Sequence, residues 1–341
     1  MDGRVEPVEP GHDGVEAAGD EMQFDWMKRR EFVTLLGGAL AWPLTARAQQ
    51  PVDAGTRKFD PRITPIRKDL AAKHLAGLVD AQRFVDGKDY EIRTSPAPVR
   101  RAPGNDTELL TEALTGERIT VYETREGWAW GQLAADGYVG FVPAAALGEC
   151  GPPATHKVSA LRTFVLPGPS IKLPPIETLS FGSQLAIARV EEPFAVTAAG
   201  GYVPLTHLAP IAAMETDYVA VAERFLGVPY LWGGKSSLGI DCSGLVQLAL
   251  VACGTNCPRD TDMQERALGS ALDRPHEVEQ LRRGDLVFWK GHVAIVRDEA
   301  TILHANAYRM AVAIEDTRAA IVRIRDQGDG EVIGARRLPH S

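Results

Sequence analysis

Short alternating stretches of apolar and polar residues fill the middle of the chain. Over residues 90–150, apolar stretches are separated by turn signals such as Asp136-Gly137, which predicts short β-strands. The pattern returns over residues 151–212, and each block closes with a Gly-Tyr-Val triplet, beginning at Gly137 and Gly201, and a Val-Pro sequence, which in the second block shares Val203 with the triplet. A repeat distance of about 60 residues predicts two small β-barrels in tandem.

The pattern changes in residues 213–341. Val219, Ala222 and Leu226 have the spacing of one helix face, and an apolar run without turn residues from Cys242 to about Cys253 predicts a second helix. The sequence LVFW, a Lys-Gly turn, HVAIV and then TILHANA predicts three consecutive strands. Helices followed by an antiparallel sheet indicate an α+β domain.

The first 89 residues divide into three segments. Residues 1–26 are acidic and have almost no apolar clusters, which predicts disorder. Residues 27–50 run from a basic start through a short apolar core to Ala-Arg-Ala, the order of a signal peptide. In residues 51–89 the spacing of Leu70, His74 and Leu78 predicts a linker with a short helix.

The basic start of the second segment also resembles a twin-arginine export signal, through Arg29-Arg30-Glu31-Phe32-Val33. This predicts export to the periplasm, with Met27 as one possible true start. The alternatives are an amphipathic or disordered leader and a cytoplasmic protein.

Composition excludes several classes of protein. A formal net charge of −8 argues against a nucleic-acid-binding protein, and no basic run suits an anionic membrane surface. Four cysteines are too few for a disulfide scaffold, and no apolar stretch reaches the roughly 18 residues of a membrane-spanning helix. We expect a monomer.

Cys242 stands where a glycine-rich loop becomes the predicted helix. Unpaired N–H groups and the helix dipole favour a thiolate at a helix start, so a lowered pKa is expected for this cysteine. Asp241 is placed to cap the same helix. The position is that of a nucleophile.

Two histidines in the predicted strands complete a possible catalytic set. Antiparallel pairing would bring His292, as the base, beside His304, which would fix its tautomer. Taken singly, each of the three residues is more often structural, and only their combination favours catalysis. A zinc site is not expected, because Cys253-x3-Cys257 has no second ligand pair at a useful spacing, and no cofactor is predicted.

Three ordered motifs carry a family resemblance. PYLWGGKSSLGIDCSGLVQ, RRGDLVFWKGHVAIV and ILHANA together resemble the NlpC/P60 cysteine peptidases across residues 217–310. The resemblance implies a papain-like catalytic domain, and the two preceding β blocks resemble bacterial SH3 domains. This layout is similar to the subgroup of dipeptidyl-peptidase VI, or γ-D-glutamyl-L-diamino acid endopeptidases.

The resemblance also implies roles for individual residues. Cys242, His292 and His304 would be the catalytic triad, and Tyr230 would lie beside the cysteine. Asp241 and Ser243 would contact the amine and backbone of the substrate, and Thr261 would stand where a serine is usual. Further contacts are expected from the first SH3-like block: Tyr138 and either Glu108 or Glu112, with Trp128 in the core of that barrel.

The activity implied is hydrolysis of γ-D-glutamyl to diamino-acid bonds in murein stem peptides that have a free N-terminal L-Ala, through an acyl-enzyme. The same thiol could instead serve a broader peptidoglycan amidase or acyl transferase. A third alternative is an inert protein that binds wall peptides. The only partner expected is the murein peptide.

Overall fold

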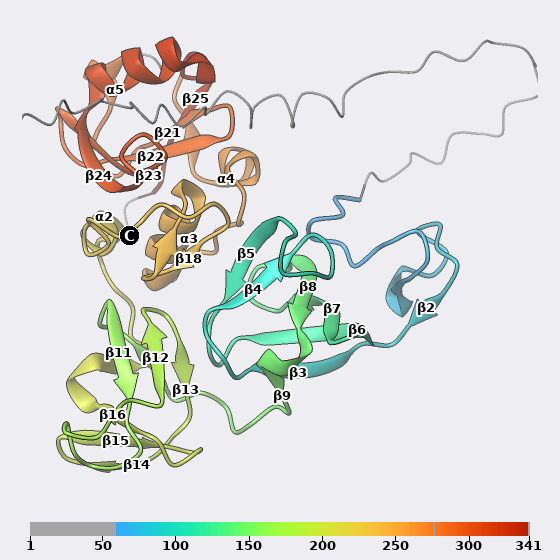
Figure 1. Ribbon diagram of the computed structural model, residues 1–341. Helices are drawn as coiled ribbons and strands as arrows, with labels where there is room; N and C mark the ends of the chain where they lie inside the picture. The colour runs from blue at the N-terminus through green and yellow to red at the C-terminus, as the bar shows by residue number, and fades with distance from the viewer. Residues whose placement is uncertain (1–58, 276, 340–341) are drawn as a thin grey trace, which may run out of the picture. The chain divides into compact units, whose positions relative to one another are not determined.

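The structure is a computed structural model that describes residues 59–275 and 277–339. The predicted extension (1–26) and signal segment (27–50) lie outside these residues. Within the described part, a short leading segment is followed by two β modules and a mixed α/β domain (Figure 1). No helix in this part of the chain is long and apolar enough to cross a membrane.

The leading segment has only three residues of the predicted short helix. It contains β1 (Ala71–Ala72), the three-residue 3-10 helix η2 (Lys73–Leu75) and β2 (Phe84–Val85). The strands pair in parallel, and Gly77 takes a positive φ of 79° where the chain turns back. Leu70 therefore packs against Trp130 and Val139 of the first β module, and Leu78 is 57% exposed, so the two residues do not share one buried helix face.

The first β module is built on one seven-stranded sheet with the order β5-β4-β8-β7-β6-β3-β9. Its strands are β3 (Lys88–Ile92), β4 (Ala97–Arg100), β5 (Leu109–Ala113), β6 (Arg118–Arg125), β7 (Trp128–Leu133), β8 (Val139–Pro143) and β9 (Leu147–Gly148). The expected core position of Trp128 is wrong, because this side chain is only partly buried. Two residues along β7, Trp130 is 3% exposed.

The second β module has the predicted strands in three small sheets. These are β13-β10-β17, β11-β12 and β14-β15-β16. The bounds are β10 (His156–Val158), β11 (Arg162–Val165), β12 (Glu177–Ser180), β13 (Gln184–Leu185), β14 (Ile187–Glu191), β15 (Phe194–Thr197), β16 (Tyr202–Pro204) and β17 (Leu208–Pro210). Both modules end alike, with a 3-10 turn after a Val-Pro sequence and then a short strand.

The last domain has the predicted α+β order. The helices α2 (Tyr218–Glu223), α3 (Cys242–Ala252) and α4 (Thr261–Ala267) precede the sheet, with the small hairpin β18 (Lys235–Ser236) and β19 (Gly239–Ile240) before α3. Because α2 ends at Glu223, the predicted helical position of Leu226 is wrong, and this side chain is 44% exposed.

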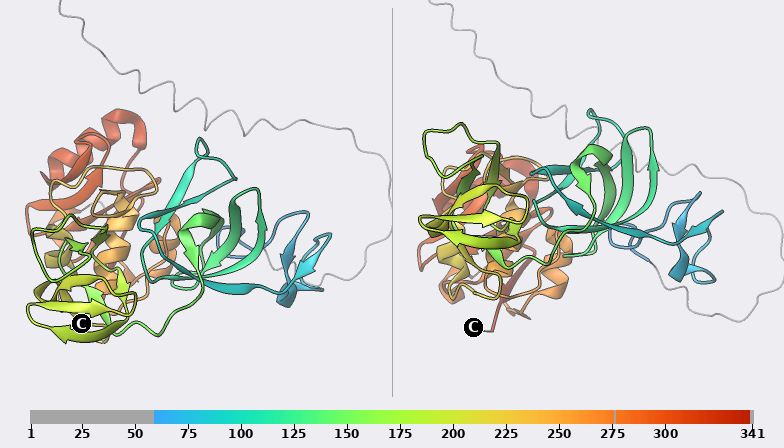
Figure 2. Two further views of the ribbon diagram at one scale, coloured as in Figure 1. Left: turned by 60° about the horizontal axis from the view of Figure 1, so that its bottom comes forward. Right: turned by 90° about the horizontal axis from the view of Figure 1, so that it is seen from below.

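The sheet of this domain has the order β20-β25-β21-β22-β23-β24. Its strands are β20 (Ser270–Ala271), β21 (Leu286–Trp289), β22 (His292–Val296), β23 (Thr301–Asn306), β24 (Ala311–Asp316) and β25 (Gly334–Arg337), with α5 (Thr317–Ile324) after β24. One apolar cluster joins the sheet to α3 and another joins it to α5. The sheet therefore lies between the two helices, and further views show both β modules beside this domain (Figures 1 and 2).

Candidate active site

Cys242 is the first residue of α3, as the sequence predicts. Asp241 caps the helix, because its side chain accepts a hydrogen bond from the Gly244 backbone N–H at 2.7 Å. The helix start is also packed closely against the preceding loop. A Cβ atom added at Gly244 would lie 2.4 Å from the carbonyl oxygen of Gly234, so only glycine fits there.

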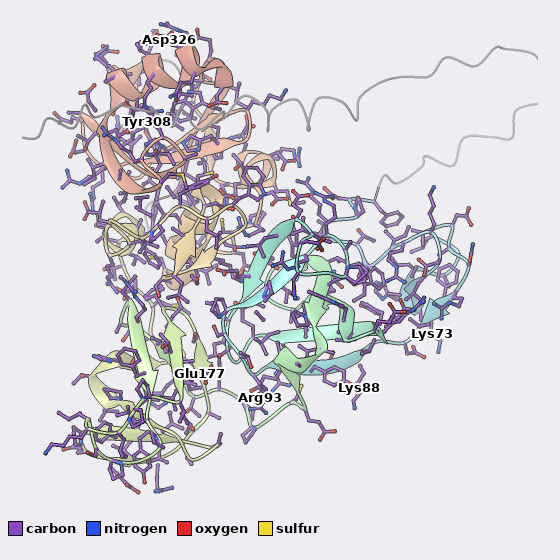
Figure 3. All side chains as sticks on the ribbon, viewed as in Figure 1. Lys73, Lys88, Arg93, Glu177, Tyr308 and Asp326 are labelled. Atoms are coloured by element: carbon purple, nitrogen blue, oxygen red, sulfur yellow. The ribbon has the colours of Figure 1, made fainter. Side chains whose placement is uncertain are left out.

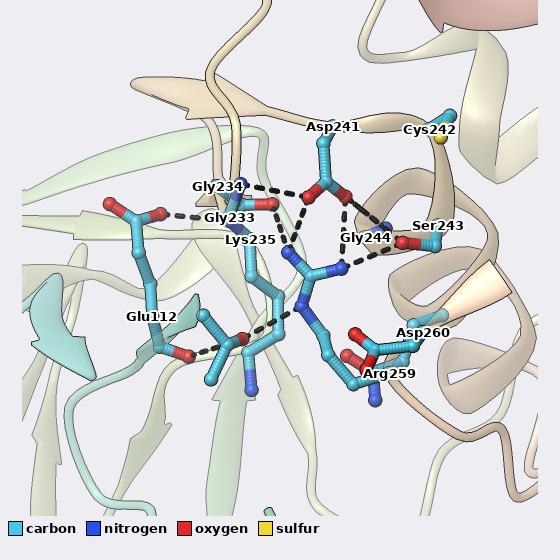
Figure 4. Close-up of polar contacts among 12 residues, drawn as sticks. Glu112, Gly233, Gly234, Lys235, Asp241, Cys242, Ser243, Gly244, Arg259 and Asp260 are labelled. Carbon is cyan, nitrogen blue, oxygen red and sulfur yellow. Dashed lines mark hydrogen bonds and ion pairs between the residues drawn. The ribbon is translucent and has the colours of Figure 1, made fainter. Parts of the chain in front are cut away.

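A buried arginine holds the residues around the cysteine in place. Arg259 donates to both carboxylate oxygens of Asp241 at 2.9 and 2.7 Å, and to the Ser243 hydroxyl at 2.8 Å. It also donates to the Gly234 carbonyl and to Thr111 of the first module, so all five guanidinium N–H groups are used. Figure 4 shows this network, with the sulfur of Cys242 outside it.

This network gives Asp241 and Ser243 a structural role. Both residues also line the cavity in front of Cys242, and their substrate contacts stay a prediction. Besides Arg259, the Asp241 carboxylate accepts from the backbone N–H groups of Gly233 and Gly244. Little acceptor capacity is left for a substrate ammonium. The Ser243 hydroxyl is likewise bonded to its neighbours, so both residues position the start of α3.

The expected lowering of the Cys242 pKa is wrong. The side chain is buried, and this burial, with the Asp241 carboxylate nearby, raises the pKa of the thiol to about 11. The backbone N–H of Val293 and the hydroxyl of Thr261, which is 4.0 Å from the sulfur, act in the opposite direction but are weaker. The thiol is therefore uncharged at neutral pH.

The two histidines lie together as predicted. His292 begins β22, and its Nε2 is 2.8 Å from Nδ1 of His304 in β23. Burial is the main cause that lowers the pKa of both imidazoles, and for His292 the shift is large. Among the described contacts there is no hydrogen bond between His292 and the Cys242 thiol, but Val293, the next residue, interacts with that thiol.

A cavity of about 290 Å³ opens in front of Cys242. It is lined by four carboxylates and two guanidinium groups together with polar and apolar side chains. The lining residues are Arg62, Arg101, Glu108, Leu110, Tyr138, Tyr230, Trp232, Asp241, Cys242, Ser243, Asp260, Thr261, Asp262 and Gly291. Asp241 is paired with Arg259, and the other three carboxylates still outnumber the two guanidinium groups by one, so the cavity is suited to a cationic group.

Most of the remaining predicted residues reach this cavity. Tyr138, Tyr230 and Thr261 line it, and so does Glu108, which forms an ion pair with Arg101 at 2.5 Å. Glu112, the alternative to Glu108, is not among the lining residues. Its carboxylate instead accepts a hydrogen bond from the backbone N–H of Lys235 at 2.8 Å.

Half of the residues that line the cavity were not singled out from the sequence, and two of them, Asp260 and Arg62, contact each other there. Asp260 accepts hydrogen bonds from the Tyr138 hydroxyl at 3.1 Å and from Arg62 at 2.8 Å, and its burial raises the pKa of its carboxyl group. Its position directly before Thr261 was a usable signal. Arg62 also contacts Asp262, and nothing in its sequence surroundings marks it as a cavity residue.

The arrangement is suited to acyl transfer by a thiol. An uncharged cysteine and an uncharged imidazole can react if the base removes the thiol proton as the sulfur attacks. No cluster of three or more His, Cys, Asp or Glu side chains arranged to hold a metal ion occurs among the described residues.

Two family models match the chain. Residues 99–147 match a model described as the bacterial dipeptidyl-peptidase SH3 domain, and residues 227–326 match the NlpC/P60 family. The first match covers the first β module, and the second covers Cys242, His292 and His304. The second β module has no match in these two models.

Curated relatives align with less than a third of the chain. Dipeptidyl-peptidase 6 of Lysinibacillus sphaericus is 36% identical over 94 residues, which are 28% of this chain and 33% of the relative. γ-D-Glutamyl-L-lysine dipeptidyl-peptidase of Bacillus cereus is 35% identical over 106 residues, 29% of this chain and 30% of the relative. The alignments thus span about a third of each relative.

A crystal structure shows the same fold over a greater length. An NlpC/P60 family protein from Bacillus cereus superimposes with a TM-score of 0.60 at 22% sequence identity. The superposition covers 74% of this chain and all of that protein.

Proposed function

Because residues 227–326 of this chain belong to the NlpC/P60 family and carry the Cys242, His292 and His304 set, we propose that the protein is a cysteine peptidase of cell-wall stem peptides. The bond cleaved is the one between γ-D-glutamate and the diamino acid, and the substrate has a free N-terminal L-Ala. The relatives named above, one of which is called a γ-D-glutamyl-L-lysine dipeptidyl-peptidase, support this substrate.

The observation that carries the proposal is the acidic cavity in front of the thiol. Asp260 is held by the Tyr138 hydroxyl from the first module and faces the same cavity as Cys242. An ammonium group paired with a desolvated carboxylate gains a charge-assisted hydrogen bond. Asp260 and Tyr138 therefore replace Asp241 as the proposed amine-binding residues, and Glu108 adds negative charge at the cavity.

The size of the cavity supports a short substrate. Its volume of about 290 Å³ is at the lower end of the roughly 300–1,000 Å³ of small-molecule pockets. A dipeptide fits such a space better than a longer chain. We also infer that the second β module is a second SH3-like barrel, because it ends on the same strand, 3-10 turn and strand as the first.

The proposal is tested by mass spectrometry of products from L-Ala-γ-D-Glu-diamino-acid peptides with a free or an acetylated amine. The free peptide should yield L-Ala-D-Glu, and the acetylated peptide should react slower by about 100-fold because it carries no charge for Asp260. Equal rates for the two peptides would contradict the amine pocket. Cleavage at another bond would favour an amidase or acyl transferase.

An Asp260→Asn variant tests the same pocket from the side of the protein. The variant should lose about 10- to 100-fold in kcat/KM for the free peptide and almost nothing for the acetylated one. Asp273→Asn, which changes an acid that does not line the cavity, is the matched control. A similar loss for both peptides would show that Asp260 serves stability instead of recognition.

Export of the protein remains a further proposal, supported by the basic, apolar and Ala-x-Ala order of residues 27–50. Cell fractionation with N-terminal sequencing tests it. A mature protein that begins after Ala48 in the periplasm would support export, and an unprocessed cytoplasmic protein would contradict it.

A further inference from the structure

A carboxylate lies behind the two histidines, on the side away from the thiol. His304 pairs with Ala313 across β23 and β24, which places Glu315 one diagonal position away on the same face of the sheet. Oε2 of Glu315 is 3.5 Å from Nε2 of His304. This ring nitrogen is buried and has no hydrogen-bond partner among the described residues, so the Glu315 carboxylate at ion-pair distance is the acceptor available to it.

Two arginines hold this carboxylate in place and ionised. Arg309 donates to Oε1 at 3.1 Å, and Arg323 from α5 pairs with Oε2. Burial alone would raise the pKa of Glu315, but the contacts with His304 and Arg323 lower it to about 2. The side chain of Tyr308 (labelled in Figure 3) stacks under Arg323, with 4.4 Å from the guanidinium carbon to the ring centre.

An ionised carboxylate determines which nitrogen of each imidazole carries the proton. A carboxylate only accepts hydrogen bonds, so it favours His304 with its proton on Nε2. Nδ1 of His304 is then an acceptor, and the 2.8 Å contact requires that Nε2 of His292 is the donor. In a neutral His292, Nδ1 then carries no proton. Because Nε2 of His292 is bonded to His304, Nδ1 is the ring nitrogen of His292 that is available to another partner.

We propose that Glu315 is a positioning residue of the active site, whose carboxylate fixes the tautomers of His304 and His292 so that Nδ1 of His292 accepts the Cys242 proton. The proposal rests on the proposed cysteine peptidase function. When the sulfur attacks, the proton moves from Sγ to Nδ1, and Glu315 stabilises the resulting imidazolium without taking up a proton itself.

The charged and titratable groups around the histidines are few. His292 and His304 face each other, Glu315 approaches from β24, Arg323 from α5 and Arg309 from the β23–β24 turn. Burial is the main cause that lowers the pKa of His292, His304 and Arg323 lower it further, and Glu315 raises it. Loss of the carboxylate charge should therefore lower the pKa of His292 further and make it a weaker base.

The test compares two variants at one position. Glu315→Gln keeps an acceptor but loses the charge, and kcat should fall about 10-fold with KM unchanged. The acidic limb of its pH profile should move to lower pH. Glu315→Leu loses the acceptor as well, and kcat should fall about 100-fold because neither tautomer is fixed.

The matched control is Glu279→Gln. Glu279 pairs with Arg318 of α5 at the surface, so this variant also removes an ion pair to α5 but touches neither histidine. Its kcat and pH profile should equal those of the wild type. If Glu315→Gln and Glu279→Gln changed kcat by the same factor and neither shifted the pH profile, Glu315 would only be a structural ion-pair partner. The proposal would then fail.

The tautomers can also be measured directly in the wild-type protein without a substrate, so this test does not depend on the proposed activity. Imidazole ¹⁵N NMR distinguishes protonated from unprotonated ring nitrogens. We expect the proton of both His304 and His292 on Nε2. A proton on Nδ1 of His304 would overturn the inference even if the enzyme is active. If NMR shows the predicted tautomers but the protein does not cleave γ-D-glutamyl peptides, only the proposed function is overturned.

Discussion

The Cys242 thiol and the imidazole of His292 are both uncharged at neutral pH. Burial raises the pKa of the thiol to about 11 and lowers the pKa of the imidazole well below its ordinary value. The helix start that favours a thiolate does not overcome the loss of water around the sulfur. In the proposed reaction, the proton is therefore transferred during the attack, and no ion pair forms beforehand.

This protonation state can be measured through alkylation of Cys242 by chloroacetamide. The rate for the Cys242 peptide, followed by mass spectrometry, should rise steadily between pH 6 and about 10, because the thiolate fraction grows tenfold per pH unit below the pKa. Glutathione serves as the reference thiol. A rate that is already constant from about pH 6 upward would indicate a thiolate–imidazolium pair and contradict this account.

At the scale of elements, the position of α3 depends on its close contact with the preceding loop. A Gly244→Ala variant would bring a methyl group against the Gly234 carbonyl and push the helix start away, at a cost of about 1–3 kcal/mol in the free energy of unfolding. The rate of peptide cleavage should fall by more than the loss of folded protein explains, since Cys242 moves with the helix.

The control for this variant is Gly168→Ala in the second β module. There the added methyl group meets only the end of the Leu173 side chain, at 3.0 Å, and that side chain can move. Urea unfolding and peptide cleavage measure both variants. Full activity of Gly244→Ala would show that the nucleophile does not depend on this contact.

The pattern of apolar and polar residues correctly predicted the helices and strands in which apolar residues recur at a regular spacing. The apolar run after Cys242 and the strands with His292 and His304 have the expected bounds within a few residues. The short helix predicted near Leu70 is reduced to the three residues of η2, which lie between the two-residue strands β1 and β2. Local periodicity does not show such long-range pairing.

The site was predictable only in part, for a similar reason. The triad is carried by motifs, whereas the partners of Asp241 depend on which side chain the fold brings to it. Arg259 follows Asp241 by 18 positions and fills its acceptor sites. Glu315 is likewise placed by the register of β24, which has no motif of its own.

At the scale of the whole molecule, the first β module and the last domain share a buried ion pair. Nζ of Lys235 is 3.0 Å from Glu117, and the side chains are 4% and 10% exposed. Tyr138 and Thr111 of the first module also contact Asp260 and Arg259 at the site. The module therefore contributes residues to the candidate active site.

Removal of one partner tests this coupling. Lys235→Met leaves the Glu117 carboxylate buried without its cation, which should cost about 3–5 kcal/mol and raise KM. Lys88→Met, at a pair whose side chains are 65% and 90% exposed, should change little. For Lys235→Met, calorimetry should show the first β module and the last domain unfolding together at a lower temperature than in the wild type. An unchanged transition and KM would contradict the coupling.

The central claim is that Cys242 attacks the γ-D-glutamyl carbonyl. Rapid acid quench of the enzyme with L-Ala-γ-D-Glu-diamino-acid peptide, followed by intact-protein and peptide mass spectrometry, tests it most directly. We predict a mass increase of one L-Ala-D-Glu acyl group on the peptide that contains Cys242, and neither adduct nor cleavage in Cys242→Ala, while Cys150→Ala behaves as the wild type. An adduct on another residue, or cleavage by Cys242→Ala at the wild-type rate, would contradict the account.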